Sequence, residues 1–258
     1  MRRRIVAQVA GLLLVAGAAA FAVLPARWVM SWVPSNWPLS IVDADGTVWQ
    51  GRATIAVGVQ GRMRTVPTPV EWRLVWGNSG WLPRPQWYVE HPWLNGPLLL
   101  APALSGMGVS GQSLEMPALV LSTLDARIAA MGPGGVLRAS WPASFLGQAE
   151  RAQGAELLRL DWLNASSSLT RVRPMGQYVL TLTQGEPGSV EMGLKTTEGP
   201  LLLEGNGVIH GRVDFNFEVV ARSAPGVGAQ TQAALQDLLA TLGPYRNGET
   251  RLRYRANP

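Results

Sequence analysis

The sequence predicts a mainly β fold: antiparallel, curved sheets with two short helices, preceded by one N-terminal transmembrane helix. Apolar and polar residues alternate along several segments, which is typical of strands that bury one face. The 29 glycines and 19 prolines are spread along the chain, as expected for strands joined by turns. A single long apolar run lies close to the N-terminus.

The apolar run covers residues 5–24 and contains one polar residue, Gln8. A helix rises about 1.5 Å per residue, so a run of this length can cross the ~30 Å hydrocarbon core of a bilayer. Arg2, Arg3 and Arg4 precede the run, and Arg27 follows it. Positive charge favours the cytoplasmic side, so the N-terminus is expected in the cytoplasm. These observations divide the chain into a cytoplasmic tip (1–4), an inner-membrane anchor (5–24) and a periplasmic β-rich domain (25–258).

Two features next to the run bear on whether it is retained. Trp28, Trp32 and Trp37 follow where an interfacial aromatic belt would lie. The small residues at 18–20 and 20–22 resemble signal-peptide cleavage sites, so a cleaved signal is the alternative. The apolar core of a signal peptide is usually only about 7–15 residues long, which favours an uncleaved anchor. Both interpretations export the body of the protein.

Period-2 patterns define the clearest predicted strands. They cover residues 70–76, 178–183 and 213–219, each with apolar side chains on one face. Residues 199–222 read as a hairpin that turns near His210. Such half-buried strands are typical of antiparallel sheets with one wet face.

Two segments instead carry helical spacing. The first contains apolar residues spaced by 3, 4 and 3 positions, followed by Gly132: Leu121, Leu124, Ile128 and Met131. The second begins near Gly228 and ends before Gly243, with four leucines on one side: Leu235, Leu238, Leu239 and Leu242. A glycine directly after the last apolar position is a common helix stop.

Residues 83–102 contain five prolines and read as a long connection or an edge segment. Proline cannot donate to a β ladder, so a central strand is not expected there. This segment could separate an N-terminal from a C-terminal part, but the pattern does not require two independent domains.

Charge and cysteine content restrict the possible functions. The net charge is +5, but three of these charges are Arg2, Arg3 and Arg4, so the body is nearly neutral. A nucleic-acid-binding face would show a clustered basic stripe. Four arginines near the C-terminus, around Glu249, fit either an amphiphilic strand end or a phosphate patch: Arg246, Arg251, Arg253 and Arg255. The chain has no cysteine, which excludes disulfides, thiolate metal sites and cysteine nucleophiles.

No motif in the sequence predicts catalysis, a metal site or a cofactor. His91 and His210 are far apart and lack metal-ligand spacing with neighbouring carboxylates. No nucleophile elbow or phosphate loop is present, and the aspartates are scattered over different predicted elements. The 11 tryptophans fit core filling or, alternatively, an apolar groove or partner interface.

Residues 46–53, GTVWQGRA, resemble the GT-(V/L)-W-x-G-x-A signature of type II secretion system protein N. Further similar segments follow in the same order, at 134–141, 160–165, 176–181 and 235–254. The resemblance implies an accessory, non-enzymatic part of the machine that moves folded proteins out of the periplasm. It implies other secretion subunits as partners and no catalytic residue. A fainter resemblance to AsmA-like proteins implies, as the alternative, a lipid-binding or lipid-shuttling domain.

Four residues are candidates for a structural or interaction role. Gly46 and Gly51 are expected to bracket a short strand, in which Trp49 would be the core anchor. Trp162 lies in one of the similar segments. A concave sheet with an apolar interior would favour the lipid hypothesis, and a filled core would favour partner contacts. A buried carboxylate pair would instead indicate an enzyme.

The predicted topology can be tested with reporters fused after residue 40. An alkaline phosphatase fusion should be active and a green fluorescent protein fusion dark, because the former needs an oxidising periplasm to form its disulfides. Cytoplasmic reporter activity at this position would contradict the topology.

Overall fold

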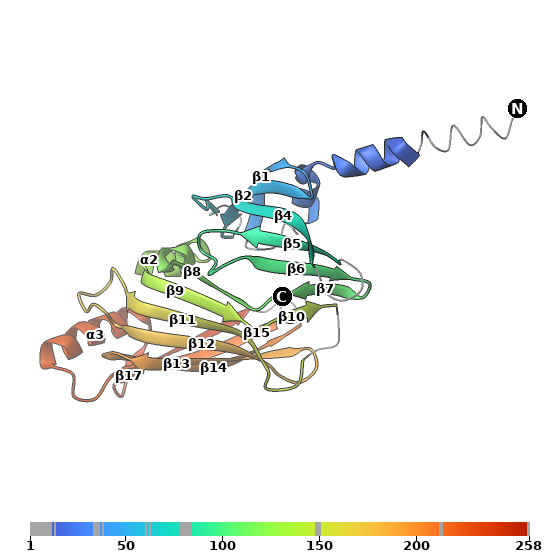
Figure 1. Ribbon diagram of the computed structural model, residues 1–258. Helices are drawn as coiled ribbons and strands as arrows, with labels where there is room; N and C mark the ends of the chain where they lie inside the picture. The colour runs from blue at the N-terminus through green and yellow to red at the C-terminus, as the bar shows by residue number, and fades with distance from the viewer. Residues whose placement is uncertain are drawn as a thin grey trace, which may run out of the picture. The chain divides into compact units, whose positions relative to one another are not determined.

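The computed structural model describes residues 12, 14–32, 37, 39–59, 61, 63–77, 84–147, 151–211 and 214–256 (Figure 1). The chain separates into two units. The first consists of Met1–His91 with Leu99–Ala101, and the second of Pro92–Leu98 with Pro102–Pro258. The architecture is mainly β with antiparallel sheets and few helices, which confirms this part of the predicted fold class.

The N-terminal segment is helical over residues 14–22, and after the non-helical residues 23–25 it forms the 3₁₀ helix η1, Ala26–Trp32. Within the described residues, no helix has both the length and the apolar character needed to cross a bilayer. Residues 1–11 and 13 of the predicted tip and anchor lie outside the described residues, as does the side chain of Trp32. The side chains of Trp28 and Trp37 are 60% and 59% exposed.

The first unit contains an antiparallel sheet in the order β1-β2-β4-β5-β6, with β3 paired to β2. The strands are β1 Leu39–Gly46, β2 Gln50–Val57, β3 Arg64–Thr65, β4 Val70–Gly77, β5 Arg84–Glu90 and β6 Leu98–Ala103. The predicted strand at 70–76 is therefore confirmed as β4. A small core forms where Ala26 of η1 meets Ala44 and Ala53, with Met30 and Trp72 packed around them. These small side chains let η1 lie close to the sheet.

The expectation of a long connection at 83–102 is wrong, because two strands, β5 and β6, lie within it. The described prolines lie near the ends of these two strands or between them. Pro85 is the second residue of β5, Pro102 is next to last in β6, and Pro92 and Pro97 lie between the strands. A count of prolines could not show that they cluster at strand ends.

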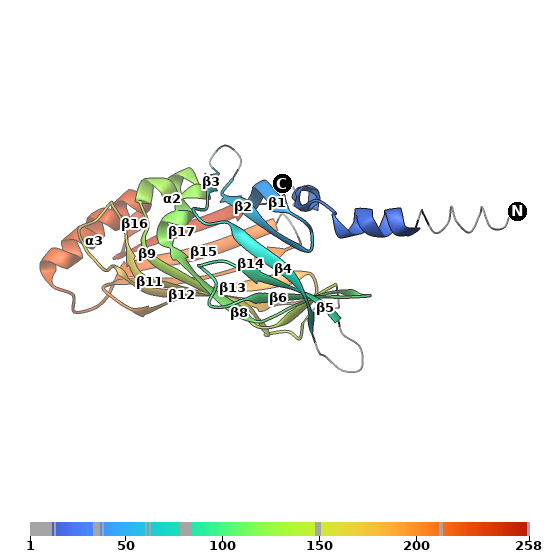
Figure 2. The ribbon, with the colours of Figure 1, turned by 45° about the horizontal axis from the view of Figure 1, so that its top comes forward.

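The second unit is built on a nine-stranded antiparallel sheet, counted over the described residues, in the order β16-β17-β15-β14-β13-β12-β11-β9-β8 (Figure 2). Its strands are β8 Gln112–Pro117, β9 Gly134–Trp141, β11 Glu156–Ser166, β12 Gly176–Gln184, β13 Ser189–Glu198, β14 Leu201–His210, β15 Asp214–Ser223, β16 Tyr245–Arg246 and β17 Glu249–Ala256. Two short strands, β7 Gly106–Val109 and β10 Ser144–Leu146, pair with each other. The predicted strands at 178–183 and 213–219 and the hairpin at His210 are confirmed, although Val213 lies outside the described residues.

Both predicted helices are present, and the first is divided. It consists of the 3₁₀ helix η2, Ala118–Thr123, and the α-helix α2, Ala126–Met131. The break falls at Asp125, whose Oδ1 accepts a hydrogen bond from the Arg127 N–H at 2.6 Å and so caps α2. Gly132 ends α2 in the left-handed conformation (φ +54°), as its position predicted. The second helix, α3, covers Ala229–Leu242.

The nine-stranded sheet has one apolar and one polar face. Paired residues line up across eight strands, from β17 to β8. One such row reads Leu252, Val219, Gly205, Leu194, Leu180, Leu160, Ala139 and Leu114. The adjacent row, on the opposite face, reads Arg253, Glu218, Asn206, Gly193, Thr181, Arg159, Ser140 and Ser113. Side chains alternate between faces, so this register carries the apolar pattern across the whole sheet.

Helix α3 buries one end of the apolar face. Leu235 and Leu239 are fully buried against Leu201 and Ala221, and Met175 completes the cluster. The Thr250 side chain donates a hydrogen bond to the Leu239 carbonyl at 3.0 Å, which fixes the helix to β17. This cluster forms the hydrophobic core of the described part of the second unit.

Replacing Leu239 with alanine should lower the free energy of unfolding of the second unit by about 2–5 kcal/mol, because it opens a cavity under α3. Urea denaturation followed by circular dichroism measures this loss. Gln230→Ala, at an exposed position of the same helix, should change it by less than about 0.5 kcal/mol. Equal effects of the two substitutions would contradict the packing of α3.

Candidate functional site

The signature segment GTVWQG forms the turn between β1 and β2. Gly46 and Gly51 are paired in register, and the Thr47 N–H donates to the Gln50 carbonyl at 2.8 Å. The Thr47 hydroxyl accepts from the Gln50 N–H at 3.1 Å, a side-chain bond that stabilises the turn. The prediction of a short strand between the two glycines is therefore wrong. The glycines face each other at the end of a hairpin, and residues 47–49 form the turn between its strands.

Two tryptophan side chains bind the backbone of this turn. The Trp72 indole N–H lies 3.2 Å from the Thr47 carbonyl and 3.1 Å from the Val48 carbonyl, and it donates to both. The Trp87 indole N–H donates to the Val48 carbonyl at 3.0 Å. Turn carbonyls have no partner in the ladder, so these indoles satisfy groups that would otherwise be costly to bury.

The turn also binds the segment that precedes the sheet. The Val48 N–H donates to the Leu24 carbonyl at 3.0 Å, and Pro25 forms an isolated bridge with Thr47. The Trp49 indole N–H donates to the Phe21 carbonyl at 2.8 Å. Backbone and side chain together thus hold residues 21–25 against the β1–β2 turn.

Trp49 lies between two other aromatic rings. Its ring centre is 4.5 Å from that of Phe21 and 6.4 Å from that of Trp87, with the Trp87 ring nearly parallel to it. The side chain is half-buried, and it is Val48 beside it that is buried. The role of Trp49 as a core anchor stays a prediction, and its contacts connect the N-terminal segment to β5.

The two glycines of the signature meet different requirements. Gly46 has φ +88°, a conformation that favours glycine. At Gly51 the limit is space, because an added Cβ would lie 2.5 Å from the Asp45 carbonyl oxygen and 2.7 Å from the Trp72 ring. The Trp72 indole can reach the turn because Gly51 leaves room for its ring.

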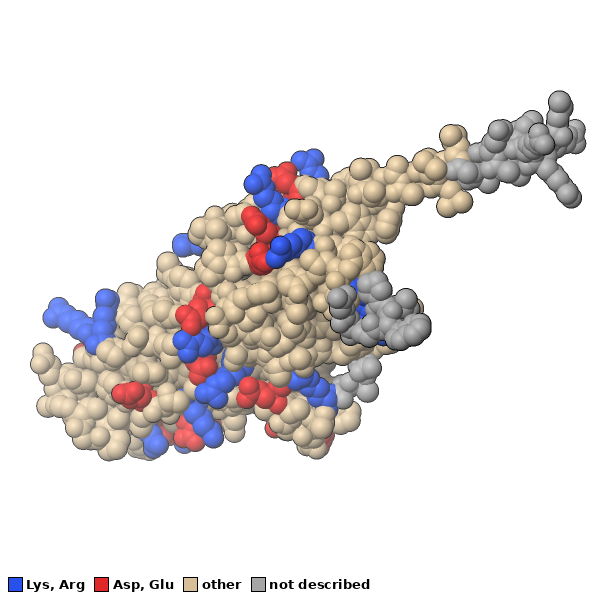
Figure 3. Space-filling model, in the orientation of Figure 1, with Lys and Arg blue, Asp and Glu red and all other residues tan. Residues whose placement is uncertain are grey.

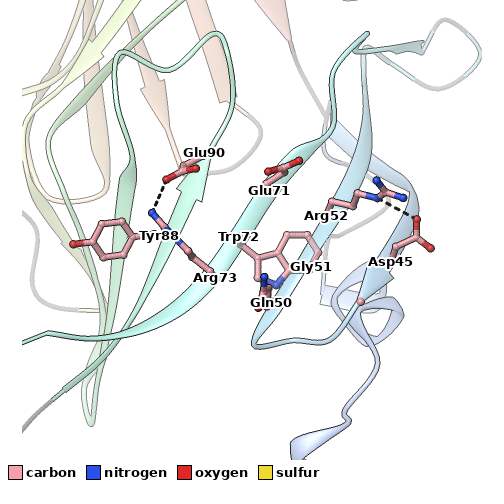
Figure 4. A pocket seen from close by; sticks show the side chains of 10 residues that line it. Asp45, Gln50, Gly51, Arg52, Glu71, Trp72, Arg73, Tyr88 and Glu90 are labelled. Carbon is pink, nitrogen blue, oxygen red and sulfur yellow. Dashed lines mark hydrogen bonds and ion pairs between the residues drawn. The ribbon is translucent and has the colours of Figure 1, made fainter.

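A polar groove of about 550 Å³ opens beside this turn, on four strands of the first unit (Figure 4). Its lining comes from β1, β2, β4 and β5, and consists of Asp45, Gly46, Gln50, Gly51, Arg52, Glu71, Trp72, Arg73, Tyr88 and Glu90. Seven of these ten residues are charged, amide or hydroxyl side chains. The groove is therefore suited to polar contacts and not to an apolar ligand.

The charges of the groove form pairs across the strands. Arg52 lies 3.5 Å from Asp45, and Arg73 lies 3.1 Å from Glu90 and also over the Tyr88 ring. Figure 3 shows acidic and basic side chains side by side over these strands. The paired side chains are about half exposed, so each pair contributes only about 0–1 kcal/mol to stability. Breaking such a pair to form contacts with another protein would therefore cost little free energy.

Glu71 is the exception among these charges. The register places it opposite Arg52 on one side and opposite Glu90 on the other. Arg52 and Arg73 form their ion pairs with Asp45 and Glu90, and Glu71 has no ion pair within the described residues. Like charges directly opposite each other are unfavourable.

Comparison with known proteins identifies the family. The family model of type II secretion system (T2SS) protein N matches residues 38–253, which include the signature turn and parts of both units. The chain belongs to the T2SS protein N family. No curated protein and no solved structure matches the chain significantly. As a member of the protein N family, the chain is a component of a type II secretion system, and the resemblance noted in its sequence is confirmed.

Further segments that resemble protein N meet inside the second unit. The Trp162 indole N–H donates to the Gly134 carbonyl at 2.9 Å, and its ring lies 5.8 Å from that of Tyr178. The Tyr178 hydroxyl in turn donates to the Leu201 carbonyl at 3.1 Å. Burial raises the pKa of Tyr178 above its ordinary value, so the hydroxyl stays protonated as a donor. Trp162 thus links β11 to β9 and β12, and these partners were not evident from the sequence.

Side chains that could bind a metal ion are dispersed in the part of the chain that the structure describes. None of its His, Asp and Glu side chains form a group of three that could hold a metal ion. His91 lies in the first unit, with Nε2 3.2 Å from the Thr68 carbonyl, and His210 lies in the second. The groups that the structure brings together are the aromatic and glycine residues of the signature turn and the paired charges of the groove.

Gly51→Ala should destabilise the first unit by about 1–3 kcal/mol, because the new methyl group would push Trp72 away from the turn. Tryptophan fluorescence during thermal unfolding would measure the loss. Gly228→Ala is the control, since no atom lies within 4 Å of the added Cβ there; as the N-cap of α3, this position should lose less than about 1 kcal/mol. A melting temperature unchanged by Gly51→Ala would contradict the close contact.

Proposed function

We propose that this protein is anchored in the bacterial inner membrane and supports the export of folded periplasmic proteins across the outer membrane through protein–protein contacts. The anchor is residues 5–24, the cytoplasmic tip residues 1–4, and the periplasmic domain residues 25–258. The apolar run and the arginines in front of it support this topology. Membership of the T2SS protein N family supports the secretion role.

The observation that carries the proposal is the attachment of residues 21–25 to the signature turn. The Leu24 and Phe21 carbonyls accept hydrogen bonds from the turn, and Pro25 bridges Thr47. Phe21 and Leu24 are near the C-terminal end of the predicted anchor, residues 5–24. The first unit would then be held at the membrane surface without a flexible linker, where the inner-membrane parts of a secretion machine lie. Exposed Trp28 fits the interfacial zone at this level.

The polar groove provides a surface for such contacts. It lies beside the signature turn, on β1, β2, β4 and β5, and its ion pairs are exposed. Glu71 has no ion pair among the residues that the structure describes and lies opposite Glu90, so a basic side chain of another secretion subunit would improve its environment. We assign the groove to subunit contact and propose no catalytic step or cofactor for it.

A lipid-binding or lipid-shuttling role is the second candidate, favoured by the apolar face of the nine-stranded sheet. The row through Leu194, Leu180 and Leu160 contains no polar side chain, and these leucines are half-buried. Acyl chains would bind such a face without leaving polar groups unpaired. The two roles predict different molecules bound to the protein in cells.

Substituting Glu71 by arginine should reduce secretion in a strain that lacks the native gene, because it reverses the one unpaired charge of the groove. We expect exported proteins to accumulate in the periplasm, with release into the medium lowered on the order of tenfold, equivalent to about 1.4 kcal/mol of lost contact energy. Glu191→Arg, an exposed change on the polar face of the second unit, is the matched control and should secrete normally. Normal secretion by the Glu71 variant would refute the groove as a contact surface.

Cross-linking in the same cells, followed by mass spectrometry, distinguishes the two roles. Recovery of other secretion subunits from the native protein, and their loss from the Glu71→Arg variant, is expected for the contact role. Recovery of phospholipid acyl chains attached to the apolar face, with no secretion subunit, would support the lipid role instead.

A further inference from the structure

The last strand of the chain leaves one edge of the nine-stranded sheet open. Strand β17 pairs with β15 along its whole length, from Glu249 opposite Arg222 to Ala256 opposite Phe215. On its other side β16 pairs with Glu249 and Thr250, and Gly243, just before β16, lies close to Thr250, Leu252 and the Arg251 carbonyl. Among the described residues, neither a strand nor a loop backbone bonds to this outer edge from residue 251 onward. An open edge is a template for an added strand.

The tight turn before β17 determines which backbone groups face outward. Asn247 and Gly248 both have positive φ, 53° and 83°, as in a two-residue hairpin turn that joins Arg246 and Glu249 in a hydrogen-bonded pair. The backbone groups of Glu249 therefore point toward β16. Backbone groups alternate along a strand, so those of every second residue point the same way: Arg251, Arg253 and Arg255.

The three residues that present their backbone at this edge are all arginines. Their side chains lie on the polar face, opposite Val220, Glu218 and Asn216 of β15. Arg251 pairs with Glu249 at 2.8 Å and Arg253 with Glu218 at 3.3 Å, but these arginine side chains are 62% and 63% exposed. Arg255 has no ion pair within the described residues. The edge thus carries an excess of positive charge on one face.

The intervening residues extend the apolar face to the same edge. Leu252 is half-buried, and Tyr254 is 41% exposed. A strand added here would therefore meet arginines on one face and apolar side chains on the other. Its own residues would need to alternate between acidic and apolar types to match both faces.

We propose that the outer edge of β17 binds an extended segment of another protein, with acidic residues opposite Arg251, Arg253 and Arg255 and apolar residues opposite Leu252 and Tyr254. The added strand would exchange backbone hydrogen bonds with Arg253 and Arg255, and beside Arg251, whose carbonyl Gly243 approaches, it would meet the arginine side chain. A second copy of this chain is excluded as the occupant, because its own arginines would face these across the joined edges. The charges that prevent self-pairing thereby select an acidic strand.

This inference rests on the contact role proposed above and gives it a second surface, but its test is independent of secretion. The full chain in detergent is titrated against a fluorescent eight-residue peptide of alternating aspartate and valine, and binding is followed by anisotropy. We expect saturable binding below about 1 mM, the weak end of specific association. The same peptide N-methylated at each aspartate keeps its charge but lacks the inward N–H groups, and it should bind at least tenfold more weakly.

Three variants locate the binding on the strand. Arg253→Ala removes one charge and should weaken binding a few-fold, whereas Arg253→Pro also removes the outward N–H and should weaken it at least tenfold. Arg138→Ala on β9, an exposed arginine on the polar face away from the edge, is the matched control and should bind normally. If the proline variant does not fold, the N-methylated peptide on the native chain decides the question.

Two results would overturn the proposal. The first is no binding of the aspartate–valine peptide up to about 1 mM, the range of the weakest specific complexes. The second is equal binding of the N-methylated peptide, or of a lysine–valine peptide. Equal binding of the N-methylated peptide would make the arginines a general anion site for phosphate or lipid headgroups.

Discussion

The indole N–H groups of Trp72 and Trp87 hold the first unit together by binding the carbonyls of one three-residue turn. Without them, the Thr47 and Val48 carbonyls would lose partners that the strand ladder cannot supply. The same turn binds residues 21–25 through its N–H groups and through Trp49. Gly51 is required for this arrangement because the Trp72 ring lies against its Cα. The residues of the family signature therefore have a structural role. Each is required by a contact with a different part of the first unit.

The strand content of the fold could be predicted from the sequence because period-2 alternation is local. Residues 70–76 and 178–183 show it within one strand, and helix α3 shows its own spacing together with a glycine stop. The signature turn could not be predicted this way. Its indole partners lie 24 to 39 residues away in the chain, and nothing near residue 47 indicates them. The two prolines within β5 and β6 were misleading for a related reason, since their effect depends on their place in the strand.

The structure brings three of the four candidate residues together, in a geometry that the sequence did not predict. Gly46, Trp49 and Gly51 do meet at one place, but as a hairpin turn. Trp162 binds the Gly134 carbonyl, so two of the segments that resemble protein N are in contact in the fold. In the sequence, only scattered charged residues indicated the polar groove and the open edge of β17. Both depend on strand register, which sequence patterns specify only when one face is clearly apolar.

The attachment of Leu24 to Val48 also has a mechanical meaning. A flexible linker absorbs motion, whereas hydrogen bonds on both sides of a turn pass displacement directly into the strands they join. A displacement of residues 21–25 would thus be transmitted to β1 and β2 at their turn. The indoles of Trp72 and Trp87 would transmit it further to β4 and β5. Because hydrogen bonds connect residues 21–25 directly to the β1–β2 turn, the first unit would move together with these residues.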